Sequence, residues 1–430
     1  MFRRAWRWPA VLATSALMLT ATIPSPAATT AAGSAASGSA ASGSAASGSA
    51  ASAEPVLDWS RVATQSIVAA GRPPASTEVL MGIVHIAIAD TVAGLGHGRP
   101  YVAAVRPDRH ASAASAVATA AYDVLKARIP AAGLDVTYAD YLAGVLDGKA
   151  KTRGITLGRA VAAAVLAWRA GDGFDKPVTY VQRPPGPGVW EPTAATPPVD
   201  LVLTQVRPLT LRSRAQFRPD GPLALTSKQY ARDVAEVAAL GRKVSTTRTA
   251  VQTETAMFWS EHTAQQFSRA LVRLAGERHL SLSEAARMLA LVHVTTGDAL
   301  IACWDAKYHY RFWRPVHAIQ RADIDRNPRT TADPTWQPLL GANHPDYPSG
   351  HACFTAATTR ALEAFFHTSR LRLSIDSQVT GTTRTYENLS AVRHDVRQAR
   401  ILSGLHFRHA MEDGDQLGTN VANWVTHRFR

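Results

Sequence analysis

The stretch SLSEAARMLALVHVTTGDALIACWDAKYHYRFWRP, residues 281–315, is the strongest indicator of the fold. Ser281 and Glu284 have the spacing of a capping box, a pair of side chains that satisfies free backbone N–H groups at a helix start. A long apolar face follows, and Pro315 disfavours helical geometry at the residue before it. We therefore expect a long central helix that ends near Arg314.

The rest of the chain after Val56 has the same helical character. Apolar residues recur at helical spacing, and strand-like alternation is scarce. Residues 176–222 differ, because they hold RPPGPGVWEPTAATPP, and a proline-rich stretch cannot form a long helix. We expect an ordered crossing segment or a lid there. The predicted fold class is all-α, with one or more bundles of about ten helices and a Pro-rich irregular crossing segment. The clearest helical segments are 77–95, 111–128, 157–170, 228–240, 256–276, 283–308, 352–366 and 389–405, followed by a last helix from about 413 to 426.

The N-terminus has the pattern of a secretory signal. Arg3, Arg4 and Arg7 precede an apolar stretch over residues 10–23 and then small residues. We predict a signal peptide over residues 1–30 and a secreted, extracellular mature protein. An uncleaved membrane anchor is the alternative, but the apolar stretch is short for a span. No later stretch supplies ~18 uninterrupted apolar residues, so we predict no stable membrane span in the mature form.

A low-complexity segment follows the signal. Residues 33–52 are four copies of GSAAS, a flexible composition with nothing to bury. We therefore divide the chain into a linker over 31–55, an N-terminal helical half with the Pro-rich segment over 56–225, and a C-terminal catalytic bundle over 226–430. All the motifs described below lie in the last of these parts.

Charge and cysteine content narrow the possible ligands. The chain has 46 Lys and Arg against 33 Asp and Glu, a formal charge of +13. This balance suits nucleic acid, an anionic surface or an anionic substrate. The basic residues are dispersed without a basic arm, so we expect no nucleic-acid partner. Export permits a disulfide between the two cysteines, Cys303 and Cys353, but the sequence leaves their pairing open.

The first motif is Lys307 with Arg314-Pro315. Residues seven positions apart lie on one face of a helix, provided that the helix persists. Two cations on one face of an apolar helix repel each other and call for a shared anion. The alternative is a basic helix end that complements the helix dipole.

The second motif is Pro348-Ser349-Gly350-His351, placed just before an apolar, alanine-rich run. Free N–H groups at a helix start bind oxyanions, a serine hydroxyl adds a donor, and glycine allows close approach. His351 would then stand within reach of a proton transfer. The alternative is that Ser349 is a plain N-cap.

The third motif is Arg400 with His406. On one unbroken helix these side chains would diverge by about 120°, so they converge only if the helix breaks, and Gly404 is a plausible break. Arg400 would clamp oxyanion oxygens with its planar fork, and His406 would offer a neutral nitrogen to a metal or phosphorus centre. The alternative is a surface arginine and a packed histidine.

Together and in this order, the three motifs resemble the signature of the acid phosphatase/vanadium haloperoxidase superfamily. That signature is Lys-x6-Arg-Pro, then Pro-Ser-Gly-His, then Ser-Arg-x5-His-x2-Asp. The strings ACWDAKYHYRFWRPVHAI, HPDYPSGHA and GLHFRHAMEDG also resemble secreted bacterial vanadium-dependent haloperoxidases. The resemblance extends more loosely over most of residues 56–430.

The resemblance implies a bound vanadate, with phosphate able to occupy the same site. It makes His406 the axial metal ligand, or the nucleophile of a phosphatase, and His351 the acid–base group. Lys307 would polarise the peroxide. The implied partners are hydrogen peroxide, a halide and a small organic acceptor. The residues implied to bind the oxyanion are Lys307, Arg314, Ser349, Gly350, Arg400 and His406.

The halide pocket is implied to hold Trp304 and His344. A histidine rather than a phenylalanine at this place resembles the bromoperoxidase pattern, so we expect bromide to be favoured. The alternative is that His344 is a loop residue facing solvent.

Two departures from the signature bear on the chemistry. Ala399 replaces the usual serine, and His409 stands where phosphatases have the aspartate that orients the axial histidine. Glu412 or Asp413 is expected to substitute for it, because a metal-bound histidine usually needs an acceptor on its other nitrogen. The missing aspartate disfavours a secreted phosphatase on the same scaffold. An inactive helical binding protein is the third hypothesis.

Overall fold

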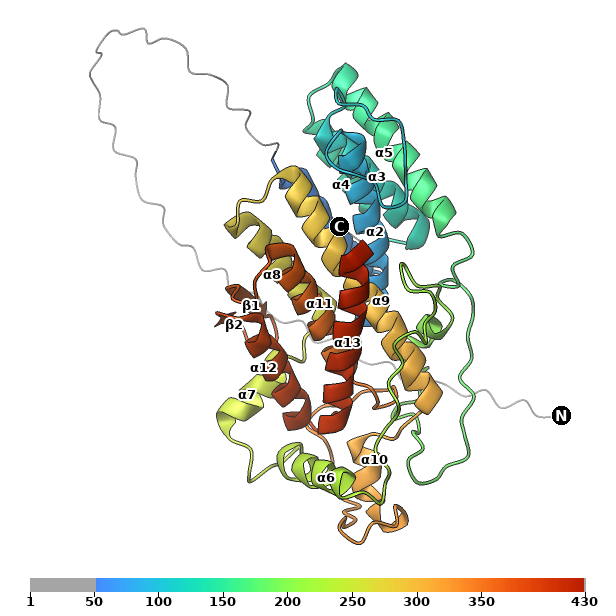
Figure 1. Cartoon of the computed structure of the whole chain (residues 1–430), viewed down its shortest axis with the longest axis vertical. Coiled ribbons are helices and arrows are strands. Elements are labelled where there is room, and N and C mark those ends of the chain that lie inside the picture. The colour runs from blue at the N-terminus through green and yellow to red at the C-terminus, as the bar shows by residue number, and fades with distance from the viewer. Residues whose placement is uncertain (1–51, 429–430) are drawn as a thin grey trace, which may run out of the picture. The chain divides into compact units, whose positions relative to one another are not determined.

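The long helix foreseen over residues 281–315 is the axis of the fold (Figure 1). This computed structural model describes residues 52–428, in which there are thirteen α-helices, two short 3-10 helices and a two-stranded hairpin. The all-α prediction is confirmed, with more helices than expected. The predicted signal peptide lies outside the described residues, as does the linker up to residue 51.

Helix α9, Leu282–Tyr310, begins as the sequence indicates. Ser281 N donates to Glu284 Oε2 at 2.8 Å, and the reciprocal capping bond is also present. The helix is buried against α2 (Pro74–Gly94), α11 (Gly350–Phe366) and α13 (Arg408–Arg428). Both α2 and α9 are long and apolar enough to cross a membrane, but their most apolar windows are 100% and 94% buried within the protein.

The remaining helices of the first half pack around α2. Their bounds, with the 3-10 turn η1 that follows them, are α1 Glu54–Ala69, α3 Ala113–Arg128, α4 Leu134–Ala143, α5 Lys149–Trp168 and η1 Leu201–Thr204. The sequence placed the start of α5 too late and did not separate α1 and α4 from their surroundings.

The second half adds shorter elements around α9, α11 and α13. The predicted helix over 256–276 is in fact two helices, because the chain turns between Phe258 and Thr263. Helix α13 begins five residues earlier than the predicted 413, at Arg408. The bounds are α6 Lys228–Leu240, α7 Ala250–Phe258, α8 Thr263–Glu277, α10 Pro315–Gln320, η2 Ala322–Ile324, α12 Leu389–Leu402, and the antiparallel strands β1 Leu373–Ser377 and β2 Thr382–Tyr386, paired from Leu373↔Tyr386 to Ser377↔Thr382.

The Pro-rich residues 176–222 form an ordered crossing segment. The backbone N–H groups of residues 209–211 donate to the buried Asp298 carboxylate of α9. At the C-terminal end of α9, Trp190 N donates to Arg311 O at 2.8 Å. Val199 N donates at 3.0 Å to the backbone oxygen of Asn343, in the loop before α11. The segment therefore runs beside α9 as far as the end that carries the sequence motifs.

Candidate active site

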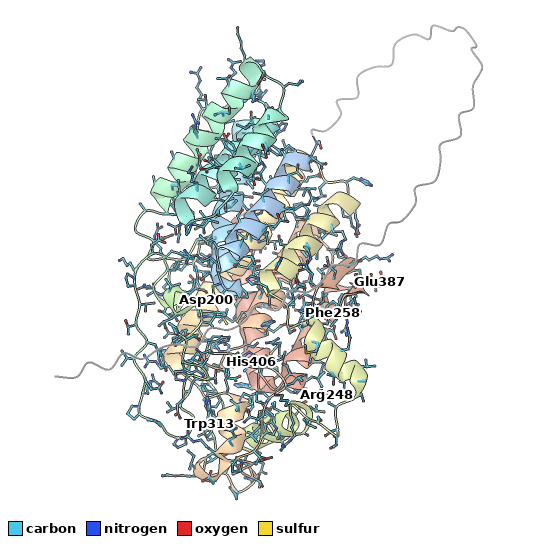
Figure 2. The ribbon with its side chains drawn as sticks, turned by 180° about the vertical axis from the view of Figure 1, so that it is seen from behind. Asp200, Arg248, Phe258, Trp313, Glu387 and His406 are labelled. Carbon is cyan, nitrogen blue, oxygen red and sulfur yellow. The ribbon has the colours of Figure 1, made fainter. Side chains whose placement is uncertain are left out.

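The three motifs meet at the C-terminal end of α9, in the region labelled by His406 and Asp200 in Figure 2. Lys307 lies in the last turn of α9 and is fully buried. Its Nζ donates to the backbone oxygens of Pro345 and Asp346, at 2.9 and 3.0 Å. These bonds hold the ammonium beside the loop that carries the second motif.

Arg314 reaches the site by a route that the sequence did not foresee. The helix ends at Tyr310, because Arg311 takes a left-handed φ of 53°, and Arg314 is the extended N-cap of α10. Lys307 and Arg314 therefore do not share a helix face. The Arg314 guanidinium donates to the backbone oxygens of His344 and Leu405, at 2.6 and 2.7 Å.

The second motif forms the start of α11. Ser349 is its N-cap and accepts a long bond of 3.5 Å from Ala352 N, so the N-cap interpretation and the anion-cradle interpretation describe the same structure. A Cβ on Gly350 would lie 2.9 Å from the Trp304 ring, so only glycine fits there. His351 Nε2 lies 2.9 Å from the Thr263 hydroxyl.

The third motif converges through a helix break at Gly404, as the sequence suggested. Helix α12 stops at Leu402, and Gly404 takes a φ of 74°. Its left-handed backbone passes so close to Gly241 that a Cβ would lie 2.5 Å from the Gly241 carbonyl oxygen. Arg400 donates to Trp259 O at 3.0 Å, while its buried Nε has no hydrogen-bond partner.

The orienting partner of His406 is Asp346. His406 Nδ1 lies 2.7 Å from Asp346 Oδ1, and both side chains are buried. The expectation of Glu412 or Asp413 is wrong. Glu412 is exposed, and Asp413 accepts a hydrogen bond from the Tyr347 hydroxyl and pairs with His409 at 3.2 Å. The signal for Asp346 was its place in the second motif, HPDYPSGH.

The site concentrates three positive charges around one buried carboxylate, Asp346, which offsets them only in part. Burial, with a smaller contribution from the nearby Arg314, lowers the pKa of Lys307 to about 8. Burial likewise lowers the pKa of Arg314 to about 10 and that of Arg400 to about 9. Across residues 52–428, none of these three cations forms an ion pair with a carboxylate, since their bonds go to backbone oxygens and to the His344 ring. A buried group of cations of this kind is stabilised by an anion.

The histidines of the site are neutral for the same reason. Burial, followed by the neighbouring cations, lowers the pKa of His351, His344 and His406 well below the ordinary range. Burial raises the pKa of Asp346 to about 7, against the opposing effect of Arg314 and Lys307. A neutral His406 that gives its Nδ1–H to Asp346 keeps the Nε2 lone pair for a ligand.

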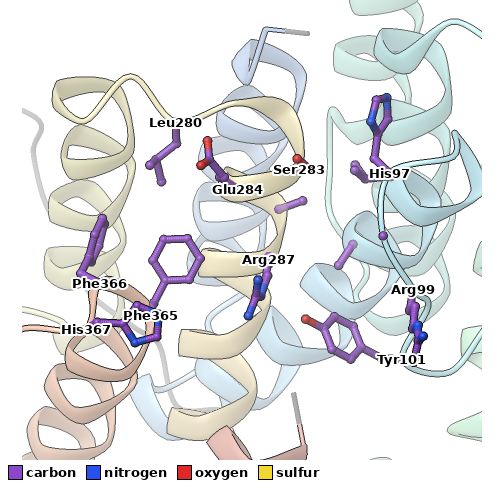
Figure 3. Close-up of a pocket in the computed structure, with 14 residues that line it drawn as sticks. His97, Arg99, Tyr101, Leu280, Ser283, Glu284, Arg287, Phe365, Phe366 and His367 are labelled. Carbon is purple, nitrogen blue, oxygen red and sulfur yellow. The ribbon is translucent and has the colours of Figure 1, made fainter. Parts of the chain in front are cut away.

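A small cavity of about 70 Å³ opens beside the cradle. Trp304, His344, Gly350 and His351 line it, and the Trp304 and His344 rings have centroids 5.4 Å apart. His344 therefore faces the cavity rather than solvent. Figure 3 shows a much larger groove of about 600 Å³ at the opposite end of α9, beside Arg287 and Phe365, and none of the motif residues lines it.

The two cysteines lie under the cradle as free, buried thiols. Cys303 Sγ lies 3.7 Å from the backbone oxygen of Pro348 in the second motif. The two cysteines therefore do not form a disulfide with each other in this structure.

The residues of the site are chemically suited to bind vanadate. Within the described part of the chain no group of three or more His, Cys, Asp and Glu could hold a metal cation. An oxyanion centre needs a different arrangement, with cations and amides for its oxygens and one nitrogen for the metal. The three buried cations, the unpartnered Arg400 Nε, the close-packed Gly350 and the Asp346-bound His406 provide that arrangement.

Fold and site together define an all-α protein with a buried oxyanion cradle. Residues 287–430 match the family of the VCPO second helical-bundle domain. The vanadium chloroperoxidase of Curvularia inaequalis is 28% identical over an alignment of 190 residues, which covers 36% of this chain and 29% of that protein's length. Residues 287–430 are thus homologous to a domain of vanadium haloperoxidases, and the chain spans less than a third of the length of this curated relative.

Solved structures agree with this fold. A bacterial vanadium-dependent iodoperoxidase superposes with a TM-score of 0.76 at 21% identity, covering 87% of this chain and 96% of the other. The holo form of a bacterial vanadium-dependent chloroperoxidase superposes with a TM-score of 0.69 at 16% identity, covering 85% and 94%.

Proposed function

We propose that this chain is a haloperoxidase that uses bound vanadate and hydrogen peroxide to oxidise halide, preferably bromide, to hypohalous acid. The observation that carries the proposal is the cradle of three buried cations around His406, none of which forms an ion pair with a carboxylate in the described part of the chain. Such a site is preorganised for a multiply charged oxyanion. Kinship with vanadium haloperoxidases supports vanadate as that oxyanion.

Each residue of the cradle has a definite task in this proposal. Bound vanadate supplies Lewis-acid activation of peroxide without changing its oxidation state. Lys307, Arg314 and Arg400 bind the oxyanion's oxygens, together with the Ser349 hydroxyl and the Gly350 amide. His406 holds the metal through Nε2, while Asp346 keeps the Nδ1 proton in place.

Proton transfer falls to His351. Its neutral state at ordinary pH allows it to accept a proton from hydrogen peroxide and return it to the product. The Thr263 hydroxyl, 2.9 Å from Nε2, fixes the ring. The cavity of about 70 Å³ admits peroxide and a halide but is small for an organic acceptor. In this proposal, therefore, hypohalous acid leaves the cavity and halogenates the acceptor outside it.

A phosphatase remains the second candidate because of one specific observation. The Asp346–His406 pair supplies the orienting carboxylate that the third motif lacks. His406 is thereby held as a nucleophile would need to be. The departure at His409 therefore does not separate the two activities.

The deciding experiment uses the purified full chain. Bound oxyanion is removed, and orthovanadate is titrated while the peroxide- and bromide-dependent bromination of a phenol dye is followed. We expect saturable activation that phosphate competes away and His406→Ala abolishes, with bromide oxidised faster than chloride. Equal chloride activity would contradict the halide preference. Hydrolysis of a phosphate ester, inhibited by vanadate and without any bromination, would establish the phosphatase instead.

We also propose that the protein is exported through residues 1–30. The basic residues 3–7 and the apolar stretch after them support this. The intact mass of the chain recovered outside the producing cell tests it, since a chain retaining residues 1–30 would contradict cleavage.

A further inference from the structure

Asp200, in the middle of the Pro-rich crossing segment of residues 176–222, lines the cavity beside the cradle. Val199 and Asp200 share this cavity with Trp304, His344 and His351. The Val199 carbonyl oxygen accepts bonds from Trp304 Nε1 and the Tyr308 hydroxyl, both at 3.0 Å, which fixes the backbone at this point. Figure 2 marks Asp200 together with His406. The crossing segment thus contributes a carboxylate to the cavity wall.

The Asp200 carboxylate is held at the start of α2. One oxygen, Oδ1, accepts a hydrogen bond from the Ser76 hydroxyl, and the backbone N–H groups of Ala75 and Ser76 also favour the charged form of the carboxylate. Among the described residues, the other oxygen, Oδ2, is buried and has no close hydrogen-bond partner. Asp200 also takes a left-handed φ of 55°, a conformation that is uncommon outside glycine. A buried polar atom left without a partner calls for an explanation.

The charges around Asp200 do not neutralise it. Arg72, just before α2, acts on it at long range and has no ion-pair distance to it. The other titratable groups that face it are Tyr308, His344 and His351, of which the two histidines are neutral. The carboxylate is therefore a negative group on the wall of the cavity that lies beside the cradle.

We infer that Asp200 is a specificity-determining residue, whose negative charge repels anionic halide from this cavity but does not act against neutral hydrogen peroxide. This inference rests on the proposed function and adds a selection between its two small reactants. A halide in this cavity lies beside the carboxylate and is repelled by it, whereas neutral peroxide is not.

The inference carries a pH signature with a definite sign. Burial raises the pKa of Asp200 to about 6. Below that pH the side chain is a neutral acid and repels nothing. Above it the carboxylate is charged, so discrimination against halide grows as the pH rises from 5 to 8.

The test is Asp200→Asn at saturating vanadate. At pH 8 we expect the KM for bromide to fall on the order of 10-fold, the size of effect for unit charges about 10 Å apart at an effective permittivity of about 20. At pH 5 the KM should match that of the unmodified protein. The KM for neutral peroxide should not fall at either pH. A bromide KM unchanged at pH 8, or lowered equally at both pH values, would overturn the inference.

Two matched variants separate charge in the cavity from other effects. Asp305→Asn removes the same charge from α9, where the carboxylate pairs with Arg218 outside the cavity, and should leave the bromide KM unchanged. Ser76→Ala removes the bond to Asp200 but keeps the carboxylate, and should not lower the bromide KM. A fall with Ser76→Ala equal to that with Asp200→Asn would make the effect structural and contradict the inference.

A second readout does not depend on turnover. Crystals of both forms soaked in bromide at pH 8 give the bromide occupancy by anomalous diffraction. We expect higher occupancy beside Trp304 in Asp200→Asn, and equal occupancy would refute the inference. If neither form brominates the dye, the proposed function fails, and the occupancy still decides the role of Asp200.

Discussion

Two buried arginines of this protein, Arg169 and Arg400, lie in opposite electrostatic surroundings. Arg169, just after α5, donates to Asp172 at 2.9 Å and to the backbone oxygens of Pro208 and Arg207. Arg400 donates to one backbone oxygen, leaves its Nε unpartnered and has no carboxylate beside it. Burial lowers the pKa of both, but Asp172 opposes the effect at Arg169, whereas Arg314 adds to it at Arg400.

The difference distinguishes a structural charge from a binding charge. The first region satisfies its arginine from within the chain, so that arginine is part of the folded structure. The second region holds a buried arginine without a carboxylate partner, and a bound anion would stabilise its charge. A buried cation without a carboxylate is therefore a better guide to the site than a buried cation as such.

Removing each arginine should give the largest effect and opposite results. We expect Arg169→Met to destabilise the protein by about 2 kcal/mol, because two backbone oxygens lose their buried donor while Asp172 keeps Arg128 as a cationic partner. Arg400→Met should leave the ligand-free stability unchanged or higher, while vanadate binding weakens on the order of 100-fold through loss of charge-assisted bonds. Guanidinium unfolding and vanadate titration measure the two quantities.

The comparison would be contradicted if the two substitutions had the same effect on stability. Equal destabilisation by both substitutions, with unchanged vanadate affinity in Arg400→Met, would make Arg400 a structural residue. Vanadate affinity in Arg169→Met serves as the control and should stay within about twofold, since Arg169 is no part of the cradle.

Two carboxylates, Asp346 and Asp413, allow a second comparison between a group that binds His406 and one that does not. Asp346→Asn should weaken vanadate binding 10- to 100-fold, roughly the cost of losing a ligand's orienting carboxylate. Asp413→Asn should change it less than about twofold, because Asp413 contacts Tyr347 and His409 rather than His406. Vanadate titration of the two variants checks both values, and the reverse order would restore the expectation drawn from the sequence.

The smallest expected effect is a pH dependence of stability. In the ligand-free protein the pKa of Lys307 is lowered from 10.5 to about 8. The unfolded chain then holds more protons between these pH values, so the contribution of Lys307 to stability is present above pH 10.5 and is lost as the pH falls through 8. Lys307→Met should therefore gain stability relative to the unmodified protein, by about 2 kcal/mol more at pH 7 than at pH 10.

Unfolding curves of the two forms at several pH values test this. Saturating phosphate should narrow the difference, since a bound anion favours the charged ammonium. A difference that is independent of pH, with and without phosphate, would mean that the buried lysine is not the group responsible.

The sequence predicted most of the helical fold because periodicity reports burial directly. Capping at Ser281 and the break at Gly404 were both visible, since each rests on one residue type in one local geometry. The hairpin and the division between α7 and α8 were missed, because they depend on contacts with distant parts of the chain.

The residues of the candidate site likewise fall into those that the sequence predicted and those that depend on tertiary contacts. The cations and histidines of the motifs are brought together as expected, although Arg314 arrives from an extended segment rather than from α9. Asp346 and Asp200 were not foreseen, because a carboxylate's partner is decided by tertiary approach. Only the structure shows that one carboxylate holds His406 while the other, 146 positions earlier, reaches the cavity from the crossing segment.

The burial of sulfur has a consequence for durability. A protein that releases hypohalous acid meets this oxidant before any other molecule does, and sulfur is the part of a protein that reacts with it most readily. Among residues 52–428 only the Met257 side chain is half-buried, whereas every other sulfur-bearing residue is at most 1% exposed. Under the proposed function, the chain would thus offer hypohalous acid few sulfur targets and should survive many turnovers, with Trp304 on the cavity wall as the first residue to be damaged. The shielded residues are Met81, Met288, Cys303, Cys353 and Met411.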